Sequence, residues 1–170
     1  MTAVRRVAGR DAALARGLRE LLSDCVDHGA SVGFLSPLDP AVADRYWDRV
    51  LGAVEQGSVL LWVAEEDGRV VGSVQIEPCS KDNGRHRGEL QKLLVLTAAR
   101  GKGVARALMA EAERFAREAH RTLLVLDTEV GSVAESVYRK LGWTRAGEIP
   151  DYATTPTGKL HPTVYYFKRL

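Results

Sequence analysis

The segment 88–142 constrains the fold of this 170-residue chain more than any other part. Its pattern predicts a strand over 89–96, a glycine turn over 97–103, a helix over 104–119 and a second strand over 122–128. The helix has apolar residues at helical spacing. The second strand is a nearly unbroken apolar run, which is typical of a strand covered on both faces. The segment therefore predicts a parallel βαβ unit, followed by a short helix.

The turn carries the features of an anion-binding site. Arg100 and Lys102 alternate with Gly101 and Gly103 immediately before the expected helix. A helix N-terminus has unpaired N–H groups and a partial positive charge, and two glycines let a bulky anion approach the backbone. A phosphate or diphosphate is the natural ligand of such a turn. The same residues are equally typical of a basic surface turn, so the turn alone leaves both interpretations open.

Two other phosphate-binding patterns fit this segment poorly. A Walker A loop requires G-x-x-x-x-G-K-[ST], and no stretch of the chain has it. A Rossmann fingerprint would use Gly101 and Gly103, but its third glycine position holds Arg106. Too little chain follows Asp127, at the end of the next strand, for the remaining βα units of that fold. Neither of these nucleotide-binding folds is therefore expected.

Two motifs resemble those of the GCN5-related N-acetyltransferases (GNAT). The stretch 100–105 is similar to the Q/R-x-x-G-x-G/A diphosphate loop of that family. The stretch 134–143 is similar to its A-x-x-x-Y-x-x-x-G-[FW] helix, although Gly131 stands where many members have asparagine. Both motifs occur in the family's order on one βαβα frame, so the chain is identified as a member of this family.

The resemblance covers essentially the whole chain and implies one N-acetyltransferase domain over residues 1–170. The implied fold is α/β, with a mixed, mostly antiparallel sheet, a central βαβ unit and helices on both faces. Acetyl-CoA is the implied cosubstrate, bound without a metal. The residues expected to bind it are Leu94, Val95, Leu96, Arg100, Gly101, Lys102, Gly103, Val104 and Ala105.

The flanking sequence agrees with this fold. We expect a first strand over 4–7, helices over 11–28 and 40–56, a hairpin of strands 59–64 and 70–77, and a last strand over 163–168. Asp11 is a suitable N-cap for the first helix. The Asp67-Gly68 pair is a strong hairpin signal.

Composition narrows the class of protein further. Lys and Arg number 24 against 22 Asp and Glu, a net charge of +2, so no general affinity for nucleic acid follows. Cys25 and Cys79 form neither a metal pair nor a disulfide framework, and the four histidines are scattered, so we expect no metal. The chain shows no secretory signal and no apolar run long enough to span a membrane, which indicates a cytoplasmic protein.

Acetyl transfer to an amine requires a neutral nitrogen, and two carboxylates are candidate bases. Asp127 stands at the carboxyl end of its strand, where ligands of open α/β sheets gather. Glu89, on the central strand, is the choice that the family resemblance implies. The alternatives are an exposed acid for Glu89 and a turn cap for Asp127. We expect the two residues to share the removal of the amine proton.

Tyr138 is the candidate acid for the leaving thiolate. Periodicity alone favours an ordinary core tyrosine, since Tyr138 shares an apolar stripe with neighbouring helix residues. The motif over 134–143 favours the catalytic role. Backbone N–H groups around Leu94 to Leu96 would stabilise the oxyanion if the strand splays there, as it does in this family.

The expected acceptor is a small, amino-acid-like amine, such as a toxin or antibiotic. The apolar loop 29–38, which contains Phe34, is expected to form one wall of its site, and Tyr152 to cap it. Arg87, in the basic loop 78–88, is a candidate partner for a carboxylate, although that loop also suits a solvated connection. A protein N-acetyltransferase and a non-catalytic CoA-binding domain are the alternatives. A homodimer, formed through strand-rich ends such as 164–167, is also considered.

Overall fold

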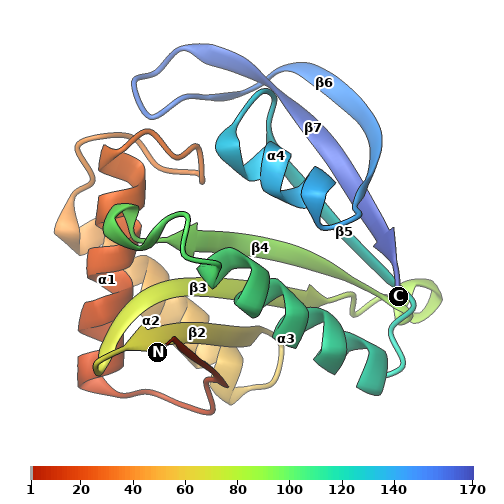
Figure 1. Ribbon diagram of the computed structural model, residues 1–170, viewed down its shortest axis with the longest axis horizontal. Helices are drawn as coiled ribbons and strands as arrows, with labels where there is room; N and C mark the ends of the chain where they lie inside the picture. Colours follow the sequence, from red (N-terminus) through yellow and green to blue (C-terminus); the bar gives the residue numbers. More distant parts are fainter. Residues whose placement is uncertain (1) are drawn as a thin grey trace.

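A single seven-stranded sheet runs through the computed structural model, which describes residues 2–170 (Figure 1). Its strands lie in the order β1-β2-β3-β4-β5-β7-β6, and within residues 2–170 β4 and β5 are the one parallel pair. The strands are β1 Ala3–Arg6, β2 Leu60–Glu66, β3 Arg69–Pro78, β4 Arg87–Val95, β5 Leu123–Glu129, β6 Thr144–Thr154 and β7 Leu160–Arg169. The helices are α1 Ala12–Asp27, α2 Pro40–Glu55, α3 Val104–Glu118 and α4 Val133–Lys140. The mixed, mostly antiparallel α/β fold is therefore confirmed.

Local sequence signals explain where several elements begin and turn. The Asp11 carboxylate accepts hydrogen bonds from the N–H groups of Ala13 and Leu14, so the predicted cap of α1 is confirmed. Asp67 and Gly68, between β2 and β3, have positive φ angles of 49° and 75°. That conformation matches the right-handed twist of the two flanking strands and closes the predicted hairpin.

Helices cover both faces of the sheet. In Figure 1, α3 crosses in front of β2 to β4, and α2 lies behind them. The fit of α3 on β3 is close, because a Cβ atom at Gly72 would lie 2.9 Å from a methyl group of Val104. On the opposite face, Gln75 of β3 is hydrogen-bonded to Tyr46 of α2. The two faces of β3 thus contact different helices.

The expectation that β5 is covered on both faces is wrong. Leu124 and Leu126 are buried, while Leu123 and Val125 are half-buried and Asp127 is exposed. Helix α4 packs beside β5. On the face of β5 that carries Val125 and Asp127, Asp127 lines a large cleft and Val125 lines a second, smaller cavity. An apolar run was therefore misleading here, because the side chains still alternate between a covered face and an open one.

Strand β6 was not predicted, and it changes the interpretation of the C-terminal region. Ten of its eleven residues are exposed, and its pairing with β7 shifts register twice, so its sequence has no alternation to recognise. Because β6 forms the edge of the sheet, β7 is an interior strand between β5 and β6. The stretch 164–167, which was considered for dimer formation, is therefore already paired on both sides.

Candidate active site

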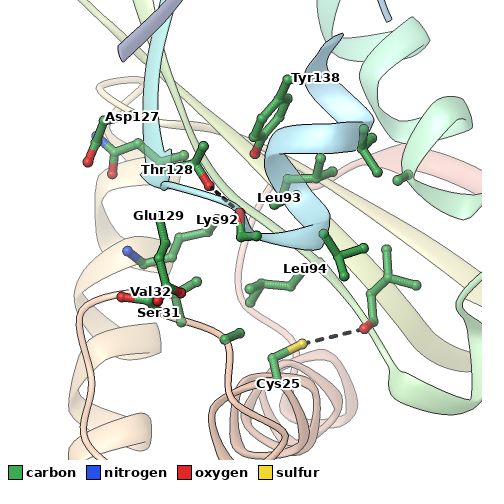
Figure 2. Close-up of a pocket in the computed structure, with 18 of the residues that line it drawn as sticks. Cys25, Ser31, Val32, Lys92, Leu93, Leu94, Asp127, Thr128, Glu129 and Tyr138 are labelled. Carbon is green, nitrogen blue, oxygen red and sulfur yellow. Dashed lines mark hydrogen bonds between the residues drawn. The ribbon is translucent and has the colours of Figure 1, made fainter. Parts of the chain in front are cut away.

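A large cleft opens where β4 and β5 separate. The two strands pair only between 87–89 and 123–125, and beyond Glu89 they diverge. The resulting cleft has a volume of about 1170 Å³. Its walls come from the loop 29–33, the second half of β4, the turn before α3, the end of β5 with α4, and the β6–β7 hairpin. Figure 2 shows this region with β4, β5 and α4 around it.

A bulge in β4 shapes this cleft. Ser73 pairs with Leu94 and Gln75 with Gln91, so two residues of β4, Lys92 and Leu93, stand opposite one residue of β3. Lys92 has a φ of 51°, in the left-handed region, which costs a non-glycine residue about 1–2 kcal/mol. Bulges of this kind re-aim side chains and end strand pairing beside functional sites.

The predicted anion turn lies at one end of the cleft. Gly101 and Gly103 have φ angles of 76° and 85°, and a Cβ atom at either would meet no atom within 4 Å. Gly103 is the N-cap of α3, whose first turn has no acidic residue. Arg100 and Arg106 line the cleft here. This glycine-lined space at a basic helix N-terminus fits the diphosphate of a coenzyme A thioester.

Glu89 and Asp127 project from the same face of the sheet. Glu89 pairs with Val125, and Asp127 is two residues further along β5, so the period of two places both carboxylates on one side. Burial, and then the charges of Asp127 and Glu77, raise the pKa of Glu89. The hydroxyl of Thr163 donates toward Asp127, with 3.0 Å between the oxygens. The cleft thus contains two neighbouring acids, one with a raised proton affinity.

Tyr138 faces the cleft from α4. Its ring is buried, with its centroid 6.0 Å from that of Trp143. Figure 2 shows its hydroxyl directed toward the gap between β4 and β5. Burial, and then the charge of Asp127, raise the pKa of Tyr138 well above its usual range. The phenol therefore keeps its proton near neutral pH, as a general acid must.

The other predicted binding residues divide into two groups. Leu94, Val95, Val104, Ala105 and Tyr152 line the cleft. Leu96 and Lys102 lie outside its lining, and the Leu96 N–H already donates to the Val71 carbonyl at 2.9 Å. Phe34 also lies outside, packed edge-on against Tyr46 with 5.2 Å between centroids. Arg87 lines a separate cavity of about 200 Å³ beside Glu77 and Cys79.

Sequence reasoning missed three features of this region. Lys92 was assigned no role, although it is a charged residue at a position where the alternation of Glu89, Leu90 and Gln91 calls for an apolar one. His161 and Glu129 face each other in the cleft, with 3.5 Å between Nδ1 and Oε1. Glu135 accepts hydrogen bonds from the Gly131 N–H and the Tyr166 hydroxyl, both at 2.7 Å, and so ties the turn before α4 to β7. The last two contacts join segments that no local pattern connects.

Comparison with known proteins agrees with this arrangement. The family model described as "Acetyltransferase (GNAT) family" matches residues 16–143. The uncharacterized N-acetyltransferase YjgM of Escherichia coli K12 is 31% identical over 159 residues, which cover 93% of this chain and 88% of that protein. An acetyltransferase from Salmonella typhimurium, solved with acetyl-CoA, has the same fold: its TM-score is 0.80 at 22% identity, over 100% of this chain and 94% of that one.

N-acetylaspartate synthetase of Danio rerio matches over a shorter region. It is 38% identical over 92 residues, which are 54% of this chain and 32% of that protein. This chain spans less than half the length of the first curated relatives that it matches. The fold and the family match define the same class of protein, that of the acetyltransferases. The chain belongs to the GNAT family of acetyltransferases.

No helix within residues 2–170 is both long enough and apolar enough to cross a lipid bilayer. Within the same residues, no group of three or more His, Cys, Asp or Glu side chains is arranged to hold a metal ion.

Proposed function

We propose that this chain moves an acetyl group from acetyl-CoA to the amine of a small, amino-acid-like molecule. The observation that carries the proposal is one cleft with a diphosphate cradle at one end and the Glu89–Asp127 pair on its wall. Tyr138 lines the same cleft. The site thus has a place for the donor and groups for both proton transfers.

The chemistry follows from these groups. An alkyl ammonium with a pKa of about 10.4 is neutral in only about one part in a thousand near pH 7.4, which costs roughly 4 kcal/mol. Glu89, with Asp127 beside it, takes a proton from the ammonium, directly or through water. The nitrogen then forms a bond to the acetyl carbon, the carbon–sulfur bond breaks, and Tyr138 gives its proton to the leaving thiolate. The second proton that the nitrogen loses on becoming an amide restores the proton of Tyr138, and the proton on Glu89 is released to water. The products are the amide and coenzyme A.

The loop that forms one wall of the cleft supports a small acceptor. The loop 29–38 is tied to the β6–β7 turn, because the Ser36 N–H donates to the Pro156 carbonyl at 2.9 Å. Apolar loops that close over a pocket exclude water from a small ligand. N-acetylaspartate synthetase, by its name, produces an acetylated amino acid. The stretches 29–34, 91–93, 127–129, 131–135 and 160–163 also resemble the tabtoxin resistance protein, an acetyltransferase acting on an amino-acid-like toxin.

Competition between acceptor classes tests this proposal. Purified protein with labelled acetyl-CoA would be offered amino acids, simple amines and lysine-containing peptides. We expect faster transfer to at least one small amino-acid-like amine than to every peptide. Faster transfer to peptides would favour the protein N-acetyltransferase alternative. Binding of acetyl-CoA without transfer to any amine would favour a non-catalytic domain. A resistance role, a cytoplasmic location and a homodimer stay predictions.

A further inference from the structure

Lys92 places an ammonium group without an ionic partner in the cleft. It lies on the acceptor side, which is the part of the cleft that contains Glu89 and Asp127. Its Nζ lies 5.6 Å from the ring centroid of Tyr46 and 5.9 Å from that of Phe34. Among residues 2–170, no carboxylate lies within ion-pair distance of this nitrogen. Two aromatic faces stabilise the charge of an ammonium, but they leave its three N–H donors without acceptors.

The bulge in β4 directs this side chain into the cleft. Gln91 pairs with Gln75, which faces Tyr46, so Gln91 points toward α2. In a regular strand the next residue, Lys92, would point to the opposite face. Its left-handed φ of 51° brings it back to the side of Tyr46 and Phe34. The distorted backbone therefore presents Lys92 to the cleft rather than to the core under α3.

Lys92 faces the two candidate bases across the acceptor side. Asp127, Arg49 and Glu89 all act on its charge, and neither carboxylate is close enough to form an ion pair with it. In Figure 2 the Lys92 ammonium and the Asp127 carboxylate lie on the same side of the view, away from Tyr138. The Lys92 ammonium is thus set apart from the Glu89 and Asp127 carboxylates. This arrangement is complementary to a molecule that carries an amine and a carboxylate a short distance apart.

We propose that Lys92 is the specificity-determining residue that binds the carboxylate of the acceptor, while Glu89 and Asp127 receive its amine. This inference rests on the proposed function and makes it narrower, since it requires an acceptor with an anionic group. Gln75 supports the arrangement, because its Nε2 donates to the Tyr46 hydroxyl at 3.1 Å and so holds the ring beside Lys92. Arg87, the earlier candidate for this role, lies in a different cavity.

The test compares acceptors that differ only in their negative charge. Amino acids and their primary amides would be acetylated by the wild type and by Lys92→Met, with KM and kcat measured for each. Comparing both proteins on the same compound cancels differences in amine reactivity. We expect KM for the acids to rise about tenfold to a hundredfold in the variant, the usual strength of a charged hydrogen bond, with KM for the amides nearly unchanged. An equal change for acids and amides would overturn the proposal.

Two further variants control for the charge and the fold. Lys92→Arg keeps the charge and should keep most of the preference for acids. Lys81→Met makes the same chemical change in an exposed loop outside the cleft and should leave the preference intact. Unchanged acetyl-CoA affinity and melting temperature in Lys92→Met would show that the variant folds.

A failure of the proposed function would be visible separately. If neither acids nor amides are acetylated, the proposed acceptor class is wrong. Calorimetry with the same compounds, in the presence of CoA, then still decides the role of Lys92. Tighter binding of acids than of amides, lost in Lys92→Met, would support the carboxylate site, and equal binding would overturn it.

Discussion

Two acids in the cleft have pKa values shifted in the direction that suits acetyl transfer. Burial raises the pKa of Glu89 and of Tyr138, and it lowers the pKa of Lys92. Burial disfavours whichever form is charged, so the acids hold their protons more tightly and the ammonium less. A base with a raised pKa accepts a proton more readily, and a phenol that stays protonated can donate one.

The role of Tyr138 can be separated from its packing. Tyr138→Phe removes the hydroxyl and keeps the ring beside Trp143. We expect kcat to fall roughly tenfold or more, the usual size of general acid catalysis, with acetyl-CoA affinity nearly unchanged. Steady-state kinetics and calorimetry would measure the two effects. Full turnover in the variant would show that Tyr138 is a core residue without a catalytic role.

The carboxylate pair makes a prediction about pH. Glu89→Gln and Asp127→Asn should each lower kcat/KM, and the loss should shrink as the pH approaches the pKa of the amine. The charge of Asp127 helps to raise the pKa of Glu89, so removing it in Asp127→Asn should lower that pKa. Because the base works deprotonated, the acidic limb of the kcat/KM profile should then move to lower pH.

Profiles of kcat/KM from acid to alkaline pH would test this sign. A limb that stays in place, or moves upward, in Asp127→Asn would show that Glu89 is not the group that titrates. A loss independent of pH in both variants would indicate that the carboxylates bind or orient the acceptor.

Secondary-structure elements supply what single side chains cannot, namely the anion cradle and the open cleft. The start of α3 presents N–H groups beside two glycines with positive φ. The bulge in β4, and the short pairing of β4 with β5, create the space that the cradle faces. Backbone geometry therefore positions the donor site, and side chains complete the acceptor site.

A glycine substitution tests the cradle. Gly103→Val adds a branched side chain in the open space before α3, so we expect acetyl-CoA affinity to fall about tenfold to a hundredfold as charged hydrogen bonds are lost. The same change also strains the backbone by about 1–3 kcal/mol, because φ is 85°. Calorimetry on the folded variant would measure the affinity.

Gly57→Val is the matched control for this strain. Gly57, in the turn after α2, also has a positive φ, of 75°, and also has open space at its Cβ, but it lies outside the cleft. The two variants should lose similar stability, and only Gly103→Val should lose acetyl-CoA. Equal acetyl-CoA affinity in the two variants would show that this turn does not bind the diphosphate.

At the scale of the whole molecule, a buried ionic network joins the central unit to the C-terminal strand. Glu113 of α3 accepts two hydrogen bonds from Lys168 of β7, at 2.8 and 3.0 Å, and one from the Trp143 indole at 3.2 Å. Lys168 also donates to the Leu141 carbonyl, at the end of α4. These contacts connect α3, α4 and β7, which together support the wall that carries Tyr138.

Loss of Lys168, the nearer of the two cations beside Glu113, should destabilise the fold. Lys168→Met leaves Glu113, whose side chain is only 8% exposed, without its nearest cation, and we expect a loss of about 2–4 kcal/mol in the free energy of unfolding. Urea denaturation would measure it. Lys159→Met, an exposed lysine in the β6–β7 turn, is the control and should change stability by less than about 0.5 kcal/mol. Similar stability of the two variants would contradict the role of the network.

The sequence by itself determined the features that depend on neighbours along the chain. The cap at Asp11, the Asp67-Gly68 turn, the periodicity of α3 and the basic glycine turn each depend on hydrogen bonds or dihedral angles within a few residues. The order of such signals, together with two family motifs, was enough to predict a mixed, mostly antiparallel sheet and the family.

Only the tertiary structure decided the features that depend on strand pairing and on the open face of the sheet. Strand β6 has no buried face, so its residues show no period, and only its pairing with β7 reveals it. Arg87 was predicted beside the acceptor and lies in another cavity, while Lys92 was overlooked and lies in the cleft. A bulge of two residues against one reverses the face of the sheet to which a side chain points. No local pattern in the sequence of β4 shows where its register with β3 shifts.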